Sequence, residues 1–263
     1  MNEHLRVVLD TSFELAEGPI WWRRENALVW VNILHGDVYA FRDDWEAPER
    51  WGLPASVGCV VEMPNGQLLA ASAAGLVDVC SGDLLAQPPF DGEKLRPNDG
   101  KLDPYGNLVY GVMRYPDSVA GEGFLTRFRN GTHELLLDGL EIPNGMVWLS
   151  SSELLFIDTP TRRIDRYRYF EEKPPEFIDV YADLSNFNGF PDGMCLDDTG
   201  SLYIAMWDGS QILKIDENGC ISRVGLPIER PTSVCQKPNT RTFYVTSAKA
   251  SDGSGGCILA IEM

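Results

Sequence analysis

The 263-residue sequence is poor in the residues on which several common catalytic and binding sites depend. It has only three histidines, His4, His35 and His133. None of them falls in the repeated site positions described below, which argues against a Ser-His-Asp triad and against a histidine-rich zinc site. A G-x-S-x-G motif, a phosphate-binding P-loop and an EF-hand loop are also absent from the sequence.

Basic residues are few, with 22 Lys and Arg against 39 Asp and Glu, for a net charge of −17. Nucleic-acid binding depends on clustered basic side chains, so we expect no nucleic-acid partner. The charge favours a neutral or cationic ligand, or a metal ion. No apolar run approaches the roughly 20 residues of a membrane-spanning helix, and the polar start MNEHLRVVLD does not resemble a signal peptide. We therefore expect a cytoplasmic protein without membrane contacts.

The cysteines show no C-x-x-C spacing and no pattern typical of a metal finger. Several fall within apolar, strand-like segments, which predicts small buried side chains in a reducing compartment. The six are Cys59, Cys80, Cys195, Cys220, Cys235 and Cys257.

Short β-branched or aromatic segments recur along the chain with Gly, Asn, Asp and Pro between them, and no long amphipathic helix is evident. This pattern predicts an all-β fold. A repeated unit consists of a short strand, a polar turn and a second apolar strand. It occurs at residues 17–32, 58–72, 98–113, 144–159, 192–207 and 232–247.

A period of about 40 to 50 residues, with four strands in each unit, is typical of a propeller blade. Six units fill the chain, so we predict one six-bladed β-propeller domain over residues 1–263, with four antiparallel strands per blade. The ring is expected to close through the N-terminal strand at 5–10, paired with a strand near 256–262.

The first strand of every blade lines the central channel of a propeller, so the residues that begin the six units should face one axis. Four of these six are carboxylates or amides, and hard oxygen donors of this kind suit Ca²⁺ or Mg²⁺. The alternative is a water-filled channel that merely has polar walls, with Asp192 as an ordinary turn residue. The six positions hold Glu17, Gly58, Asn98, Asn144, Asp192 and Thr232.

Four motifs resemble the SMP-30/gluconolactonase/luciferin-regenerating-enzyme family, to which regucalcin belongs. They are AEGPIWW, RPNDGKLDPYGNL, IPNGMVW and FPDGMCLDDTGSLYIAMW, in the order that the family shows. The resemblance covers essentially the whole chain. It implies a six-bladed propeller that depends on a divalent metal and hydrolyses sugar lactones.

The resemblance also implies specific roles at the channel. Glu17, Asn144 and Asp192 would bind one divalent ion, with Ca²⁺ favoured and Mg²⁺, Mn²⁺ or Zn²⁺ open. Asp192 would in addition act as the general acid/base. A metal-bound carboxylate is a weaker base than a free one, and the sequence leaves this conflict open.

On the substrate side, the resemblance implies that Arg96 and Asn98 contact a small lactone, with Asp99 in a supporting role. From spacing alone, Arg96 is equally consistent with a surface or inter-blade salt bridge. The loop at 114–123 lacks the acidic substrate contact of animal members. Glu122 and Arg114 are the candidates to replace it, and sugar specificity stays open.

Bound to a dication, a lactone carbonyl is polarised and the charge that develops on its oxygen is stabilised. A metal-dependent lactonase is therefore the favoured function, in a monomer or weak dimer. Two alternatives remain: a metal-dependent phosphotriesterase or aryl esterase on the same fold, and a non-catalytic metal-binding propeller.

Overall fold

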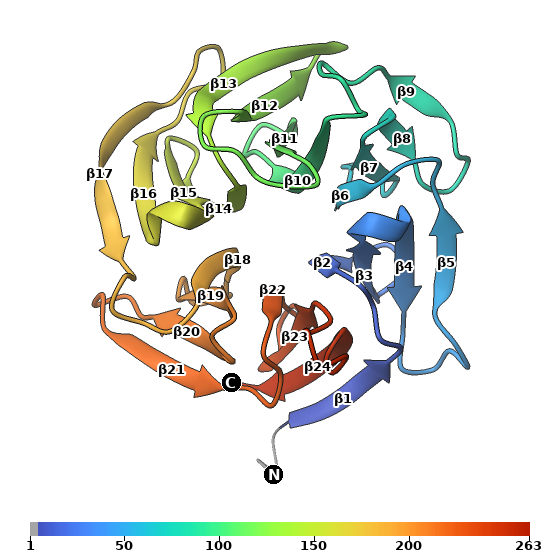
Figure 1. Cartoon of the computed structure of the whole chain (residues 1–263), viewed down its shortest axis with the longest axis vertical. Coiled ribbons are helices and arrows are strands. Elements are labelled where there is room, and N and C mark those ends of the chain that lie inside the picture. Colours follow the sequence, from blue (N-terminus) through green and yellow to red (C-terminus); the bar gives the residue numbers. More distant parts are fainter. Residues whose placement is uncertain (1–4) are drawn as a thin grey trace.

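A computed structural model describes residues 5–263 as six four-stranded antiparallel sheets arranged in a ring around a central channel (Figure 1). The predicted six-bladed β-propeller is thus confirmed. In five of the sheets the strands follow one another in sequence from the channel outward, since consecutive strands pair as hairpins, and in the sixth the outermost strand is the N-terminal β1.

The first three blades take up the N-terminal half of the ring. Blade 1 comprises β2 (Ala16–Trp22), β3 (Ala27–Asn32), β4 (Asp37–Phe41) and β5 (Glu49–Gly52). Blade 2 comprises β6 (Val57–Glu62), β7 (Leu68–Ser72), β8 (Gly75–Asp78) and β9 (Leu84–Ala86). Blade 3 comprises β10 (Leu95–Leu102), β11 (Leu108–Arg114), β12 (Gly123–Arg129) and β13 (Thr132–Leu140).

The other three blades complete the ring. Blade 4 comprises β14 (Pro143–Ser150), β15 (Glu153–Asp158), β16 (Arg163–Arg168) and β17 (Glu176–Asp183). Blade 5 comprises β18 (Phe190–Leu196), β19 (Leu202–Trp207), β20 (Gln211–Ile215) and β21 (Ile221–Gly225). Blade 6 comprises β22 (Pro231–Gln236), β23 (Thr242–Ser247), β24 (Cys257–Glu262) and, at its outer edge, β1 (Leu5–Asp10).

The ring closes as predicted, because β1 pairs antiparallel with β24 from Leu5 opposite Ile261 to Asp10 opposite Cys257. Strands from the two ends of the chain therefore share one blade, and Figure 1 shows them side by side. This pairing covers the edge of β24 that would otherwise be exposed.

Deletion of residues 1–10 should lower the midpoint of thermal unfolding by roughly 5–10 °C, because the sixth blade loses a strand and a few kcal/mol of pairing and packing. Differential scanning calorimetry of the truncated and full chains measures this shift. An unchanged midpoint would show that ring closure by β1 contributes nothing to stability.

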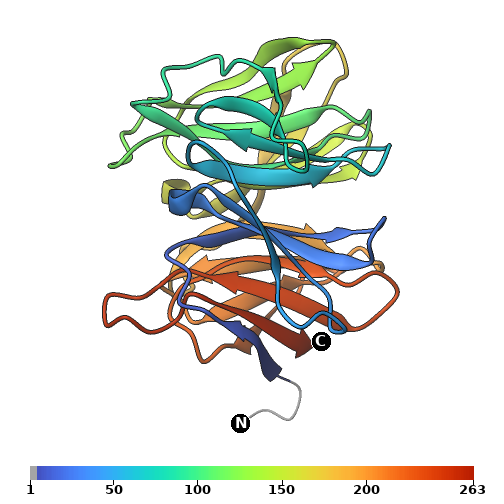
Figure 2. The same ribbon diagram turned by 90° about the vertical axis from the view of Figure 1, so that its right-hand side faces the viewer.

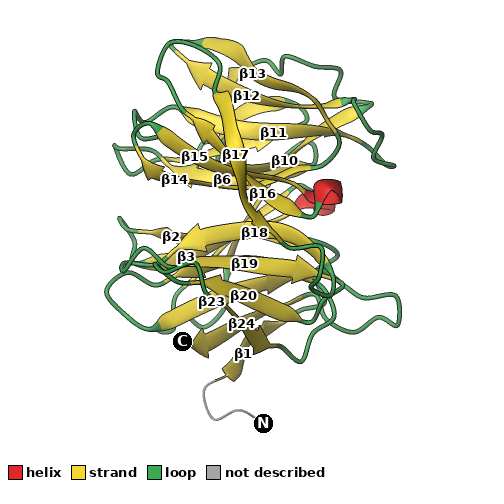
Figure 3. Ribbon diagram, turned by 90° about the vertical axis from the view of Figure 1, so that its left-hand side faces the viewer, coloured by secondary structure: helices red, strands yellow, loops and turns green. Residues whose placement is uncertain are grey.

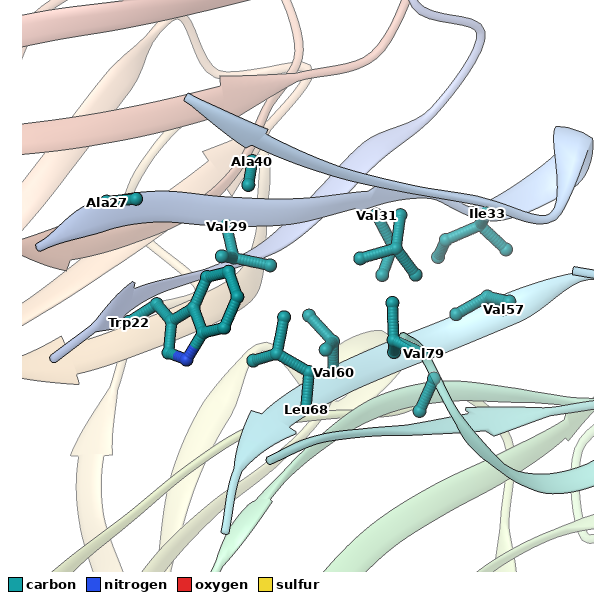
Figure 4. Packing of buried hydrophobic residues seen from close by; sticks show 12 residues of the cluster. Trp22, Ala27, Val29, Val31, Ile33, Ala40, Val57, Val60, Leu68 and Val79 are labelled. Carbon is teal, nitrogen blue, oxygen red and sulfur yellow. The ribbon is translucent and has the colours of Figure 1, made fainter. Parts of the chain in front are cut away.

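Hydrophobic side chains from the faces of neighbouring blades pack together, and the described residues form six such clusters, one at each blade junction. Figure 4 shows the junction of blades 1 and 2, where Val29 and Val31 of β3 face Val57 and Val60 of β6. Each blade is thus buried on both faces, which explains the nearly continuous apolar strands. The clusters hold the inner strands at fixed positions around the channel.

Four cysteines are buried, as predicted for small hydrophobic side chains, whereas Cys80 and Cys220 are exposed. No helix within residues 5–263 combines the length and the apolar character needed to cross a lipid bilayer. Two short 3-10 helices, η1 (Ile33–His35) and η2 (Thr159–Thr161), lie on the same face of the ring (Figures 2 and 3). That face carries the site described next.

Candidate functional site

A cavity of about 420 Å³ lies at the end of the channel where the inner strands begin, on the face that bears η1 and η2. Its walls include Glu17 of β2, Asn144 of β14 and Asp192 of β18. Arg96 and Asn98 of β10 complete the polar part of the lining. Five of the six predicted site residues are therefore brought together by four separate strands of the chain, β2, β10, β14 and β18.

Every inner strand contains a register shift at the repeated position, which explains why these side chains reach the channel. The shift falls between Glu17 and Ile20 in β2, between Pro143 and Met146 in β14, and between Pro191 and Met194 in β18. The other three inner strands are interrupted at the same place. Bulges of this kind re-aim side chains next to active sites.

The Asn144 and Asp192 side chains each have one buried oxygen, Oδ1, that has no hydrogen-bond partner. Buried polar atoms are nearly always paired, so two unpaired acceptors in one cavity wall need an explanation. The third side chain, Glu17, accepts a hydrogen bond from the Gly18 amide at 2.5 Å through Oε2. Glu17, Asn144 and Asp192 are all at least nine-tenths buried, with exposed fractions of 4%, 4% and 5%.

Burial is the main reason why the carboxyl groups of this site have raised pKa values. Burial raises the pKa of Glu17 well above its usual value, and repulsion from Asp192 and Asp99 raises it further. Burial likewise raises the pKa of Asp192, with Asp99 as the next cause. A compensating positive charge is what such a cluster of buried acids requires.

Arg96 is buried and lines the cavity, which contradicts the alternative of a surface salt bridge, and within residues 5–263 it forms no inter-blade salt bridge either. Its Nη1 donates to the Pro97 carbonyl at 2.9 Å and to Asn98 Oδ1 at 2.8 Å. The guanidinium lies over the Tyr115 ring at 5.6 Å, and burial lowers the pKa of Arg96 to about 10. Asn98 Nδ2 in turn donates to the Pro143 carbonyl at 3.1 Å. Asn98 therefore holds Arg96 in place and links blades 3 and 4.

Asp99 is buried but is not among the residues that line the cavity. Its Oδ1 accepts a hydrogen bond from the Gly100 amide at 2.7 Å, and its Oδ2 has no partner. Burial raises the pKa of Asp99, and the nearby Lys101 ammonium partly offsets that rise. Its predicted substrate contact stays a prediction, whereas its effect on Glu17 and Asp192 is electrostatic.

The two candidates for an acidic or polar contact from loop 114–123 bind each other instead. Arg114 Nη1 lies 2.6 Å from Glu122 Oε2, and neither residue lines the cavity. Two further acidic residues line the cavity, Glu141 and Asp208, and neither was predicted from the sequence. Asp208 is paired with Arg230 at 2.7 Å. Glu141 accepts a hydrogen bond from Ser118 of the loop at 2.8 Å.

No group of three or more His, Cys, Asp or Glu side chains suited to a metal ion is present within residues 5–263. Neither His35 nor His133 lines the cavity, and His4 lies outside the described residues. Glu17, Asn144 and Asp192 differ from such a group because they combine two carboxylates with one amide, and all three offer oxygen ligands. Such a set suits Ca²⁺, Mg²⁺ or Mn²⁺ better than a site built from histidine or cysteine.

Several curated proteins are similar to the chain over nearly its full length. A pentonolactonase of Haloferax volcanii is 32% identical over 255 residues, which cover 95% of this chain and 87% of that protein. A 6-deoxy-6-sulfogluconolactonase of Pseudomonas putida is 27% identical and covers 100% of this chain and 96% of its own. Regucalcin of Xenopus laevis is 30% identical, with coverages of 93% and 86%.

Solved structures share the fold. A luciferin-regenerating enzyme superposes with a TM-score of 0.86 at 20% identity, covering 98% of this chain and 95% of the other. The family model described as "SMP-30/Gluconolactonase/LRE-like region" matches residues 15–249, which include every predicted site residue. The chain therefore belongs to the SMP-30/gluconolactonase/LRE-like family.

Proposed function

We propose that the protein is a divalent-metal-dependent hydrolase that opens sugar lactones. The observation that carries this proposal is the pair of buried, unpaired oxygens on Asn144 and Asp192 in a cavity that also holds the Arg96 guanidinium. The names of two relatives, a pentonolactonase and a sulfogluconolactonase, support the substrate class.

The residues fit a divalent cation on the evidence of their own chemistry. Glu17, Asn144 and Asp192 would hold it, because they converge from three blades and two of them have an oxygen that no protein group uses. Oxygen-only ligation favours Ca²⁺, with Mg²⁺, Mn²⁺ and Zn²⁺ as alternatives. When bound, the ion supplies Lewis acidity toward the lactone carbonyl and lowers the pKa of water beside it.

Three side chains of the cavity then have separate roles in binding the lactone and transferring the proton. Arg96 presents fixed donors to the lactone oxygens, and its stacking on Tyr115 restricts how it can turn. Asn98 keeps Arg96 in that orientation through the 2.8 Å hydrogen bond. Asp192 accepts the proton of the attacking water and returns it to the leaving alkoxide.

Metal removal tests this proposal. Protein stripped with a chelator should hydrolyse D-glucono-1,5-lactone or a pentonolactone at no more than ~1% of the rate of the reloaded protein, since a Lewis acid lowers the barrier by several kcal/mol. A pH indicator follows the acid released, and Ca²⁺, Mg²⁺, Mn²⁺ and Zn²⁺ are added back separately. Equal rates with and without metal would contradict the proposal.

A second candidate is a metal-dependent aryl esterase or phosphotriesterase. It is favoured by the apolar residues Met113, Phe190 and Trp207 in the cavity wall, which suit an aromatic group. The same protein is assayed with phenyl acetate and paraoxon. Turnover of these with none on aldonolactones would select this candidate, and no turnover on any substrate would favour a non-catalytic metal-binding propeller.

A further inference from the structure

The Thr159 side chain connects the strands that carry two of the proposed metal ligands. Asn144 Nδ2 donates to Thr159 Oγ1 at 3.1 Å, and Thr159 Oγ1 donates to the Pro191 carbonyl at 2.9 Å. Thr159 begins η2 and lines the cavity beside Asn144 and Asp192. One hydroxyl therefore touches the ligand side chain of blade 4 and the residue directly before the ligand of blade 5.

The direction of these two hydrogen bonds determines which way the Asn144 amide faces. A threonine hydroxyl has one proton, and here that proton goes to the Pro191 carbonyl. Its lone pairs can then only accept, so the Asn144 NH₂ group must face Thr159. Asn144 Oδ1 is left on the other side of the amide, where it is buried and accepts no hydrogen bond.

The reverse orientation of the amide would remove a metal ligand. It would turn Oδ1 toward Thr159, whose proton is already committed, and direct two N–H donors to the place of the cation. Donor groups repel a cation, so the orientation of this amide determines whether Asn144 can ligate at all.

We propose that Thr159 is a positioning residue for the metal site, which holds Asn144 Oδ1 toward the cation and ties the strand of Asp192 to the same point. This inference rests on the proposed metal site, because it concerns how that site is organised. Partners that orient metal ligands typically change metal affinity by ~10–100-fold when they are removed.

The test compares two substitutions of similar size. Thr159→Val keeps the shape and removes the hydroxyl, so the Ca²⁺ affinity of the metal-stripped protein should fall ~10–100-fold. Thr159→Ser keeps the hydroxyl and should bind within about 3-fold of wild type. Isothermal titration calorimetry with Ca²⁺ measures each affinity without any assay of turnover.

Thr161→Val is the matched control, because it makes the same chemical change two residues later in η2. The Thr161 hydroxyl is exposed and donates to the Asp158 carbonyl at 2.7 Å, away from the ligands. Its Ca²⁺ affinity should equal that of wild type. Thermal unfolding in chelator establishes that each variant folds, and Thr159→Ala replaces the valine variant if that one does not.

A double substitution isolates the orienting role. Asn144→Asp offers an oxygen in either orientation, so adding Thr159→Val to it should weaken Ca²⁺ binding by less than about 3-fold, against ~10–100-fold in the wild-type background. Equal losses in both backgrounds, wild-type affinity in Thr159→Val, or a loss in Thr159→Ser as large as in Thr159→Val would each overturn the inference. Absence of Ca²⁺ binding by the wild-type protein would instead overturn the metal site itself, and this inference with it.

Discussion

Asp192→Asn, assayed at saturating metal, is expected to lose at least ~100-fold in lactone turnover. The asparagine keeps one oxygen for the cation and the approximate shape of the side chain, so the site stays assembled. It cannot accept a proton at neutral pH, and general-base catalysis typically contributes ~10²–10⁴-fold. Initial rates with D-glucono-1,5-lactone at increasing Ca²⁺ separate this loss from weaker metal binding.

Asn144→Asp is the companion variant, because it retains an oxygen ligand, adds a charge and leaves the Asp192 side chain itself in place. It should keep turnover within about 10-fold of wild type, far above the Asp192→Asn rate. Near wild-type rates in both variants would show that another group carries the proton. Asp99 is one candidate, since its buried Oδ2 has no hydrogen-bond partner, although the residue does not line the cavity.

Gly145→Ala should disrupt the site through the backbone. A Cβ at this position would lie 2.5 Å from the Asp192 carbonyl oxygen and 2.9 Å from Met194 Cγ, both on the inner strand of blade 5. Overpacking of this kind costs about 1–3 kcal/mol. A shift of about 1 Å in Asp192 lowers turnover up to ~10²-fold.

Gly225→Ala is the matched control, because no atom lies within 4 Å of a Cβ built at this position in β21. Calorimetry should show a midpoint roughly 2–10 °C lower for Gly145→Ala and an unchanged midpoint for Gly225→Ala. If both variants matched wild type in stability and turnover, the inner strands of blades 4 and 5 would have to be free to separate, and the close contact at Gly145 would have no role.

The fold was predictable because each blade repeats one pattern of apolar strands and polar turns. The predicted units begin at 17, 58, 98, 144, 192 and 232, and the observed inner strands begin within three residues of these positions. The pairing of β1 with β24 was predictable for a related reason: the last unit held one strand too few, and LRVVLD was an unassigned strand-like segment.

The cavity was predictable only where its residues fall in that repeat. Glu17, Asn98, Asn144 and Asp192 occupy equivalent positions, so their convergence follows from symmetry. Thr159, Glu141 and Asp208 come from connections between strands, where no period relates one blade to the next. The position of Asp99 could not be predicted from the sequence either, because the bulge between Pro97 and Gly100 decides which side chain enters the cavity.

The pairing of β1 with β24 also determines when the ring can close while the chain is being synthesised. The ribosome produces β1 before the other described strands and its partner, β24 (Cys257–Glu262), after them. At about 5–20 residues per second, β1 waits roughly 10–50 s with its backbone groups unpaired. During this interval the emerging blades can pack one after another, but the ring cannot close, because β24 is not yet available to pair with β1. Closure of the ring therefore depends on a segment that must stay accessible, and must not pair with other nascent chains, until β24 has been made.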